Sequence, residues 1–253
     1  MTAVKAEQVG EGVHRVADGL VNWYVLEEDG RLALVDTGWP RSWPTIEGAL
    51  SALGRSPADV EAILLTHGHP DHLGAAERAR AATRAPVRAH RDEVARVHGE
   101  SKNASPFKLV PALVPQLRRG AAMRFVLQAT VQGFMTPKWV REVDAFDTGD
   151  ELDVPGRPRV VATPGHTEGH VAFHLPSHGV VIAGDEIVVR DPITGACGPR
   201  IPHDAVNAQP ARSRESLVQL EGLEADTLLT GHGDPWRGSM GDAVARAREA
   251  DAD

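Results

Sequence analysis

Thr66-His67-Gly68-His69-Pro70-Asp71-His72 directly follows the apolar run Ala62-Ile63-Leu64-Leu65. Four of its side chains, at positions 67, 69, 71 and 72, can bind a metal ion. His67 and His69 point to the same side if the strand continues, whereas Asp71 and His72 lie beyond the bend at Pro70. Because the two pairs can face two adjacent ions, the stretch predicts a two-metal site whose remaining ligands lie elsewhere in the chain.

Other apolar runs also end in a residue that could complete such a site. They are 32–35 before Asp36, 160–163 before Pro164-Gly165-His166, 180–183 before Gly184-Asp185, and 227–230 before Gly231-His232. By composition each run is a short buried strand with its polar residue at the C-terminal end. Ligands gathered from the ends of distant strands are a common way to build an active site at a sheet edge. Scattered histidines that are each hydrogen-bonded in their own loops would not produce this placement repeatedly.

At these residues the chain resembles the metallo-β-lactamase-fold hydrolase superfamily. The similarity runs from Asp36 through the His-x-His-x-Asp-His stretch, the Thr-Pro-Gly-His-Thr of 163–167 and Gly184-Asp185 to Gly231-His232, and so spans most of the chain. It is highly specific for the fold and the metal site but poorly specific for the substrate. The fold it implies is α+β, a four-layer αββα sandwich built from two similar halves, with the metals between the sheet edges.

The resemblance also implies a role for each ligand residue. It assigns one ion to His67, His69 and His166, a second ion to Asp71, His72 and His232, and a bridging position to Asp185. Asp36 would orient a ligand from behind. The expected cofactors are two divalent ions, zinc first, with iron or manganese as alternatives because every ligand is His or Asp. Two such ions lower the pKa of a shared water to about 7, and Asp71 would act in catalysis by accepting a hydrogen bond or a proton from the resulting hydroxide.

Composition predicts one enzyme domain over residues 1–253. The chain has 253 residues, of which 42% are hydrophobic, so it can bury a sizeable core. It has no apolar run long enough for a membrane span, no apolar signal-peptide core at its N-terminus, and a single cysteine, Cys197, so we expect a cytoplasmic protein. A net charge of −8 argues against nucleic acid as a partner and leaves a small-molecule substrate.

The segment from about 91 to 145 exceeds what the sandwich needs and is predicted to be a helical insertion. Apolar residues recur at helical spacing over 107–117 and 123–134, although Pro111 and Pro115 must break or kink the first of these helices. Residues 101–141 contain no Asp or Glu but seven cationic residues: Lys102, Lys108, Arg118, Arg119, Arg124, Lys138 and Arg141. In an acidic chain, this asymmetry suggests that the segment faces an anionic group.

Several interpretations of the insertion remain open. It could be a lid over the metals with a positive charge for an anionic or acyl substrate. It could be the surface of a homodimer, a segment lying on an anionic membrane, or a helical pair with solvated basic faces. The candidate substrate contacts are Phe107, Phe134, Met135 and Trp139 in the insertion, together with His203 and Trp236 outside it.

The predicted function is a dinuclear metal-dependent hydrolase that uses a bridging hydroxide to cleave an ester, thioester or lactone of a small substrate. Asp185 favours this class, because metallo-β-lactamases carry Cys or Ser at the bridging position, whereas glyoxalase II-like thioesterases and acyl-homoserine lactonases carry Asp. An alternative is a mononuclear iron oxidoreductase resembling the persulfide dioxygenases. A β-lactamase and a phosphodiesterase are further alternatives. The sequence leaves the substrate, the native metal and the oligomeric state undetermined.

Overall fold

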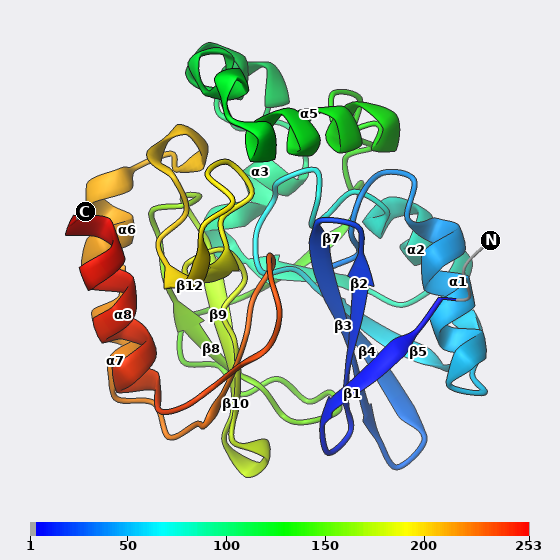
Figure 1. The fold of residues 1–253 in the computed structure, drawn as a ribbon. Coiled ribbons are helices and arrows are strands. Elements are labelled where there is room, and N and C mark those ends of the chain that lie inside the picture. The colour runs from blue at the N-terminus through cyan, green and yellow to red at the C-terminus, as the bar shows by residue number, and fades with distance from the viewer. Residues whose placement is uncertain (1–3, 253) are drawn as a thin grey trace.

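Two β-sheets packed face to face form the centre of the molecule, and helices cover the outer face of each. The structure is a computed structural model that describes residues 4–252. In Figure 1 the layers run from α6, α7 and α8 on one side, through the two sheets, to α1 and α2 on the other. The predicted α+β class and the four-layer αββα sandwich are therefore confirmed.

The first sheet has seven strands in sequence order. They are β1 (Ala6–Gly10), β2 (Val13–Asp18), β3 (Val21–Glu28), β4 (Arg31–Val35), β5 (Val60–Leu64), β6 (Val87–His90) and β7 (Val143–Phe146). Strands β1 to β4 pair antiparallel, and β4 to β7 pair parallel. The parallel pairing of β4 with β5 brings the two C-terminal ends, at Asp36 and Thr66, to the same edge of the sheet.

The second sheet has five strands and lies against the first. Their order is β14 (Trp236–Arg237), β13 (Thr227–Leu229), β10 (Val180–Ile182), β9 (Val171–Leu175) and β8 (Arg159–Ala162). A separate ribbon pairs β11 (Val188–Arg190) with β12 (Cys197–Arg200). The apolar runs that precede His166, Asp185 and His232 are β8, β10 and β13, so their prediction as strands is confirmed. β10 and β13 are buried throughout, whereas β8 is only partly buried.

Three apolar clusters hold the layers together. The helices of the two outer layers are α1 (Trp43–Ala52), α2 (Ala76–Thr83), α3 (Val94–Val97), α6 (Pro210–Ser216), α7 (Val218–Glu221) and α8 (Met240–Ala252). Trp23 packs in the cluster beneath α1 and α2, whereas its neighbour Tyr24 packs between the two sheets. The third cluster joins the second sheet to α7 and α8 through Leu220 and Val244. None of the helices in residues 4–252 is long and apolar enough to cross a membrane.

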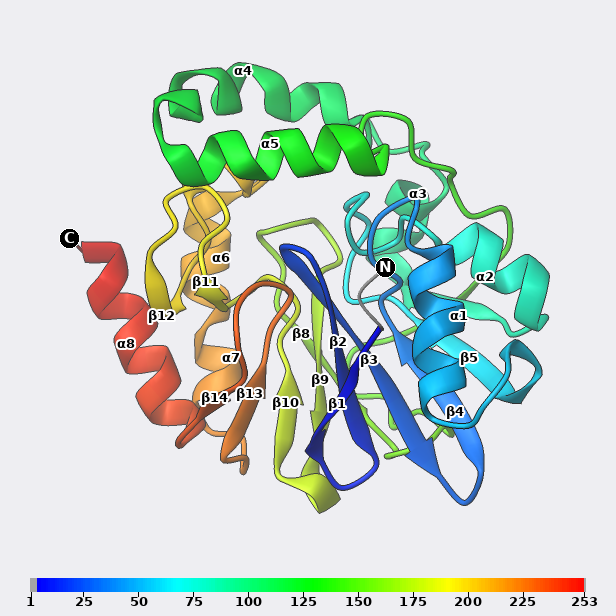
Figure 2. The same cartoon turned by 45° about the vertical axis from the view of Figure 1, so that its right-hand side comes forward.

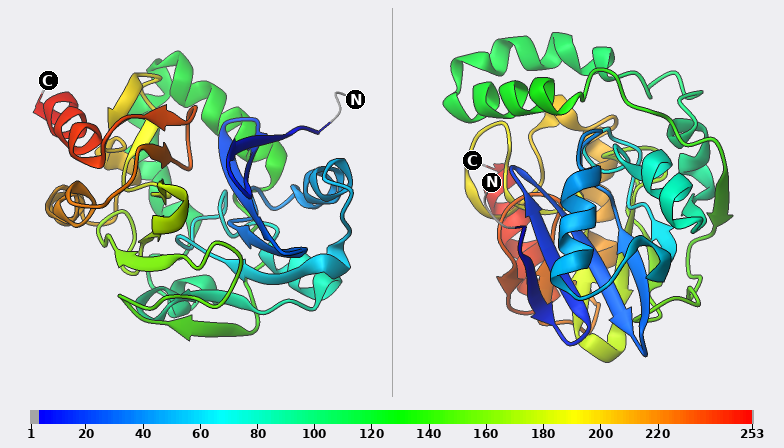
Figure 3. Two further views of the ribbon diagram at one scale, coloured as in Figure 1. Left: turned by 90° about the horizontal axis from the view of Figure 1, so that it is seen from below. Right: turned by 90° about the vertical axis from the view of Figure 1, so that its right-hand side faces the viewer.

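The segment 91–145 leaves the sandwich only in its middle part. At its ends, Val97 of α3 packs in the cluster of the first sheet and β7 pairs with β6, so the insertion is narrower than the sequence suggested. The middle part forms α4 (Val110–Leu113), between two 3₁₀ turns, and α5 (Gly120–Gln132). Each proline of the broken helix stands near the start of a new turn. Figure 2 and the right-hand view of Figure 3 show α4 and α5 lying across one end of the sandwich.

Candidate metal centre

The ends of four strands, β5, β8, β10 and β13, bring the candidate ligands into one buried cluster. The possible ligands form three overlapping groups, and within each group the ligand atoms lie within 4.8 Å of one another. The groups are His67, His69 and His166; His67, His72 and Asp185; and Asp71, His72 and His232. All seven side chains are at most 8% exposed. The residues that the sequence proposed as metal ligands are thus together in the structure, although they are up to 165 positions apart (67 to 232).

Two of the histidines are fixed from behind through their Nδ1 atoms. His72 Nδ1 lies 2.9 Å from Asp36 Oδ2, and His232 Nδ1 lies 2.6 Å from the carbonyl oxygen of Leu20. A carboxylate and a carbonyl can only accept, so both Nδ1 atoms carry the proton. In the neutral form of each ring the lone pair is then on Nε2, as a metal ligand requires.

His67 and His166 are oriented by the same principle. Thr66 Oγ1 donates to Asp36 Oδ2 at 2.7 Å, so it can only accept from His67 Nδ1, which lies 3.0 Å away. The amide of Asn207 donates to the carbonyl of Pro202, which turns its Oδ1 toward His166 Nδ1 at 2.7 Å. Both rings therefore also present an unprotonated Nε2.

Several buried ligand atoms without a hydrogen-bond partner within residues 4–252 show whether the cluster suits a metal ion. His67 Nε2, His72 Nε2 and Asp185 Oδ1 are buried and have no hydrogen-bond partner among the described residues. A buried polar atom without a partner costs free energy, so such atoms call for an explanation. His166 Nε2 faces His69 Nδ1 at 2.9 Å and cannot donate to it. The donor set fits divalent metal ions.

Asp185 lies between the two ligand groups. Its Oδ2 is 3.6 Å from His166 Nε2 and 3.2 Å from His232 Nε2, while its Oδ1 is 3.6 Å from His72 Nε2. His170 Nε2 accepts from the backbone N–H of Asp185 at 3.0 Å and so positions this residue. Gly184 has a φ of 52° and lies so close to His170 that a side chain would not fit there.

The electrostatics divide the histidines into two kinds. Burial lowers the pKa of His67 and His69, and it lowers the pKa of His166 to about 4. Burial alone would also lower the pKa of His72 and His232, but the nearby carboxylates, Asp185 foremost, overcome this effect and raise both. The group around His67 thus consists mainly of neutral rings, whereas that around His72 contains the carboxylates.

Glu93 is a structural residue of the site that the sequence analysis missed. Its carboxylate is 1% exposed and accepts from the N–H of Gly68 at 2.8 Å and from that of Gly169 at 2.7 Å. It therefore joins the loop of the first four candidate ligands to the loop that follows His166. Glu93 lies in a short turn after β6, where an acidic residue gives no sequence signal. Asn207 was also missed, because an asparagine at the end of a short turn gives no sequence signal either.

The metal cluster lies under an apolar roof. A cavity of about 20 Å³ is lined by His69, His166, Asp185 and His232 below, and by Leu109, Phe125 and Phe134 above. A second, almost wholly apolar cavity of about 120 Å³ lies between α4 and α5 and shares Phe125 and Phe134 with the first. The inner face of the α4–α5 pair therefore covers the cluster. The same face lines a neighbouring cavity that is suited to an apolar group.

Of the six residues that the sequence proposed as substrate contacts, only Phe134 and Met135 line the cavities next to the ligand cluster. Phe134 lines both cavities, and Met135 lines the apolar one. Phe107 is 63% exposed and shares a more distant surface hollow with Trp139. His203 accepts from the N–H of Ala205 in the loop before α6, and Trp236 packs against the cluster beneath α8.

Comparison with known proteins agrees with this architecture. The family model for the metallo-beta-lactamase superfamily matches residues 16–232. The chain belongs to this superfamily. Membership makes a metal-dependent hydrolase the enzyme class of the chain, as the sequence predicted.

Two relatives of this chain are named as hydrolases. The Bacillus subtilis protein named Probable metallo-hydrolase YflN is 28% identical over 91% of this chain and 87% of its own length. A hydroxyacylglutathione hydrolase of Fuscovulum blasticum is 31% identical over 85% of this chain, which spans only 62% of that relative.

Solved structures share the fold. The crystal structure of a metallo-beta-lactamase family protein from Thermus thermophilus has a TM-score of 0.67 and 29% identity, covering 96% of this chain and 79% of that one. A B3 metallo-beta-lactamase with an active-site glutamic acid also has a TM-score of 0.67, at 22% identity, covering 97% of this chain and 88% of that one. At 22% identity, the similarity to this β-lactamase establishes only that the two proteins share a fold.

Proposed function

We propose that this metallo-beta-lactamase superfamily member is a dinuclear hydrolase that cleaves an ester, thioester or lactone of a small substrate. The observation that carries the proposal is the orientation of four histidines, each tied at Nδ1 and each presenting a bare Nε2 to the same buried cluster. His67, His69 and His166 would hold one ion, Asp71, His72 and His232 the other, and Asp185 would bridge them. Zinc is the first candidate, and iron or manganese would suit the same donors.

The bound ions, Asp71 and the two phenylalanines would have different roles in the reaction. Two bound ions supply a water that ionises near neutral pH and polarise the scissile carbonyl. Asp71 lies beside the second group, with Oδ2 at 3.6 Å from His232 Nε2, and burial raises its pKa. A carboxylate with a raised pKa can take up a proton from the attacking water and pass it to the leaving group. Phe125 and Phe134 exclude bulk water from the reaction.

The apolar cavity indicates which part of the substrate lies under the roof. It shares Phe125 and Phe134 with the cavity over the ligand cluster and is also lined by Leu113, Val114 and Ala129. An acyl chain placed there would leave its carbonyl at the metals. The relatives named hydroxyacylglutathione hydrolase support an acyl thiol ester as one substrate class.

A mononuclear iron oxidoreductase is the second candidate from another class. In that reading His67, His72 and His232 would be poor ligands or none. The bare, buried Nε2 atoms of His67 and His72 favour the dinuclear reading, because a one-metal site would leave at least one of them without a partner. A cytoplasmic location and a homodimer stay predictions.

The test is elemental analysis of the purified protein followed by a panel of thioesters, lactones, aryl esters, phosphodiesters and β-lactams. We expect two ions per chain and hydrolysis confined to the acyl substrates, with loss of activity in Asp185→Ala. One iron per chain with oxygen uptake on a persulfide would support the oxidoreductase instead. Preferred cleavage of phosphodiesters or β-lactams would replace the acyl-hydrolase proposal.

A further inference from the structure

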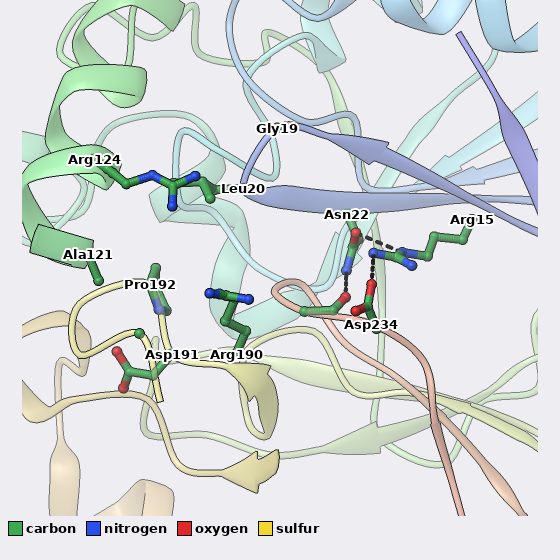
Figure 4. A pocket seen from close by; sticks show the side chains of 12 residues that line it. Arg15, Gly19, Leu20, Asn22, Ala121, Arg124, Arg190, Asp191, Pro192 and Asp234 are labelled. Carbon is green, nitrogen blue, oxygen red and sulfur yellow. Dashed lines mark hydrogen bonds and ion pairs between the residues drawn. The ribbon is translucent and has the colours of Figure 1, made fainter. Parts of the chain in front are cut away.

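A third cavity, distinct from the apolar one, shares a wall with the ligand cluster. It measures about 340 Å³, and its walls come from the turn between β2 and β3, from the start of α5, from residues 190–195 and from Gly233 with Asp234 (Figure 4). Pro192 lines both this cavity and the metal cluster. Leu20, another wall residue, accepts the hydrogen bond of the candidate ligand His232. A molecule in this cavity can therefore extend to the metals.

Arginine side chains dominate the walls of this cavity. Arg15, Arg124 and Arg190 all line it, and Figure 4 shows Arg124 extending from α5 and Arg190 from β11. Arg15 is largely buried, and its guanidinium is already bonded to Asn22, Glu7 and Asp234. Within residues 4–252, Arg124 and Arg190 have no side-chain hydrogen bond and no ion pair.

The acidic side chains of the cavity do not neutralise these two arginines. Asp191 is 2% exposed, and its carboxylate accepts from the backbone N–H groups of Ile193, Thr194 and His203. Asp234 pairs with Arg15. The first turn of α5 also lies at the wall, through Ala121, and contains no acidic residue and no side-chain cap. A helix N-terminus of this kind adds a partial positive charge.

We propose that this cavity binds an anionic group of the substrate, a carboxylate or phosphate, through Arg124 and Arg190. The inference rests on the proposed function, because that proposal places the scissile carbonyl at the ligand cluster, which shares wall residues with both cavities. A guanidinium presents paired N–H donors that match the two oxygens of such a group. The substrate class is then an acyl compound with an apolar acyl chain and a negative charge in the leaving group.

The α4–α5 pair contributes to this site through one particular residue. Of the seven cations in 101–141, Arg124 lines the cavity, whereas Arg118 is exposed at the end of the preceding 3₁₀ turn and Arg119 bonds to Gln116. Arg118→Gln therefore makes a matched control. It removes the same charge from the same segment, away from the cavity.

The experiment compares two aryl esters that differ by one charge, 4-carboxyphenyl hexanoate and its neutral methyl ester, 4-(methoxycarbonyl)phenyl hexanoate, so that the charge lies in the leaving group and the apolar chain in the acyl group. In Arg124→Gln and in Arg190→Gln, the ratio of kcat/KM for the anionic over the neutral ester should fall about three- to fivefold each, the size expected for partly exposed ionic contacts. The double variant should lose about tenfold or more. The same ratio in the unmodified protein should fall as salt is added. Arg118→Gln should retain the ratio.

A binding measurement separates this inference from the proposed function. Glutarate and propyl phosphate are titrated calorimetrically into the metal-loaded protein and into the double variant. Weaker binding of either anion by the double variant than by Arg118→Gln supports the cavity assignment, and the anion more strongly affected identifies the group. Equal binding by all three proteins, or equal loss of both esters in the single variants, overturns it. If a protein with two ions hydrolyses neither ester, the acyl-hydrolase proposal fails while the titration still decides the role of the arginines.

Discussion

Asp36→Asn is the substitution that most sharply tests how the second metal position is built. Asp36 is 1% exposed and accepts three hydrogen bonds: from the backbone N–H of Thr66, from its hydroxyl, and from His72 Nδ1. Its φ is 61°, in the left-handed region that asparagine tolerates better than most residues. The substitution is nearly isosteric, so it alters the hydrogen bonds and leaves the backbone unstrained.

The amide would place two donor hydrogens where the carboxylate has only acceptors. If its nitrogen faces His72, the ring must move its proton to Nε2 and can no longer bind a metal there. If its nitrogen faces Thr66, a donor opposes a donor in the buried site. Loss of such a supporting partner lowers metal affinity by about 10–100-fold, which corresponds to about 1.4–2.7 kcal/mol. The effect should fall mainly on the ion held by His72.

The assay is a competition titration with a chromophoric chelator, which reports the two dissociation constants separately. Asp191→Asn is the matched control, because Asp191 is also a buried carboxylate with three hydrogen bonds but contacts no candidate ligand. We expect one weakened ion in Asp36→Asn and two unchanged ions in Asp191→Asn. Equal metal loss in both variants, or none in either, would refute the account of how His72 is oriented.

Three further predictions concern the bridge, the loop support and the roof. Asp185→Ala should weaken both ions, whereas His232→Ala should mainly release one, as measured by metal stoichiometry; equal losses would remove the bridging assignment. Glu93→Gln turns a donor toward Gly68 or Gly169 and should cost about 1–3 kcal/mol of unfolding free energy, seen as a Tm lower by about 2–12 °C for a chain of this size; an unchanged Tm would contradict the support role. Ala129→Leu narrows the apolar cavity and should lower kcat/KM for hexanoyl esters more than for acetyl esters, and a parallel change in both would count against an acyl chain at this place.

The sequence could predict the layers of the fold and the composition of the site because both depend on local patterns. Short apolar runs predicted the strands β4, β5, β8, β10 and β13, and the polar residue after each run predicted what gathers at the sheet edge. The pairing of those edges was not itself visible. It came from the resemblance to a known family.

Other features depend on contacts that no local pattern encodes. Glu93 joins two loops that are far apart in sequence, at Gly68 and Gly169, and Asn207 reaches His166 from a turn before α6. The sequence also indicated a basic insertion, but it could not show that Arg124 reaches the cavity while Arg118 does not. The end of the insertion was placed too late, because β7 is only four residues long and half exposed and so gives a weak strand signal, although it completes the first sheet.

The central claim is that one buried cluster holds two metal ions and that hydrolysis requires both. The most direct measurement strips the purified protein of metal, adds zinc back in steps, and follows the number of ions bound and the hydrolysis of an aryl ester in the same samples. The account predicts two ions per chain at saturation, with full activity only when the second is bound. Saturation at one ion per chain, with all seven candidate ligands unaltered and activity already complete, would contradict it.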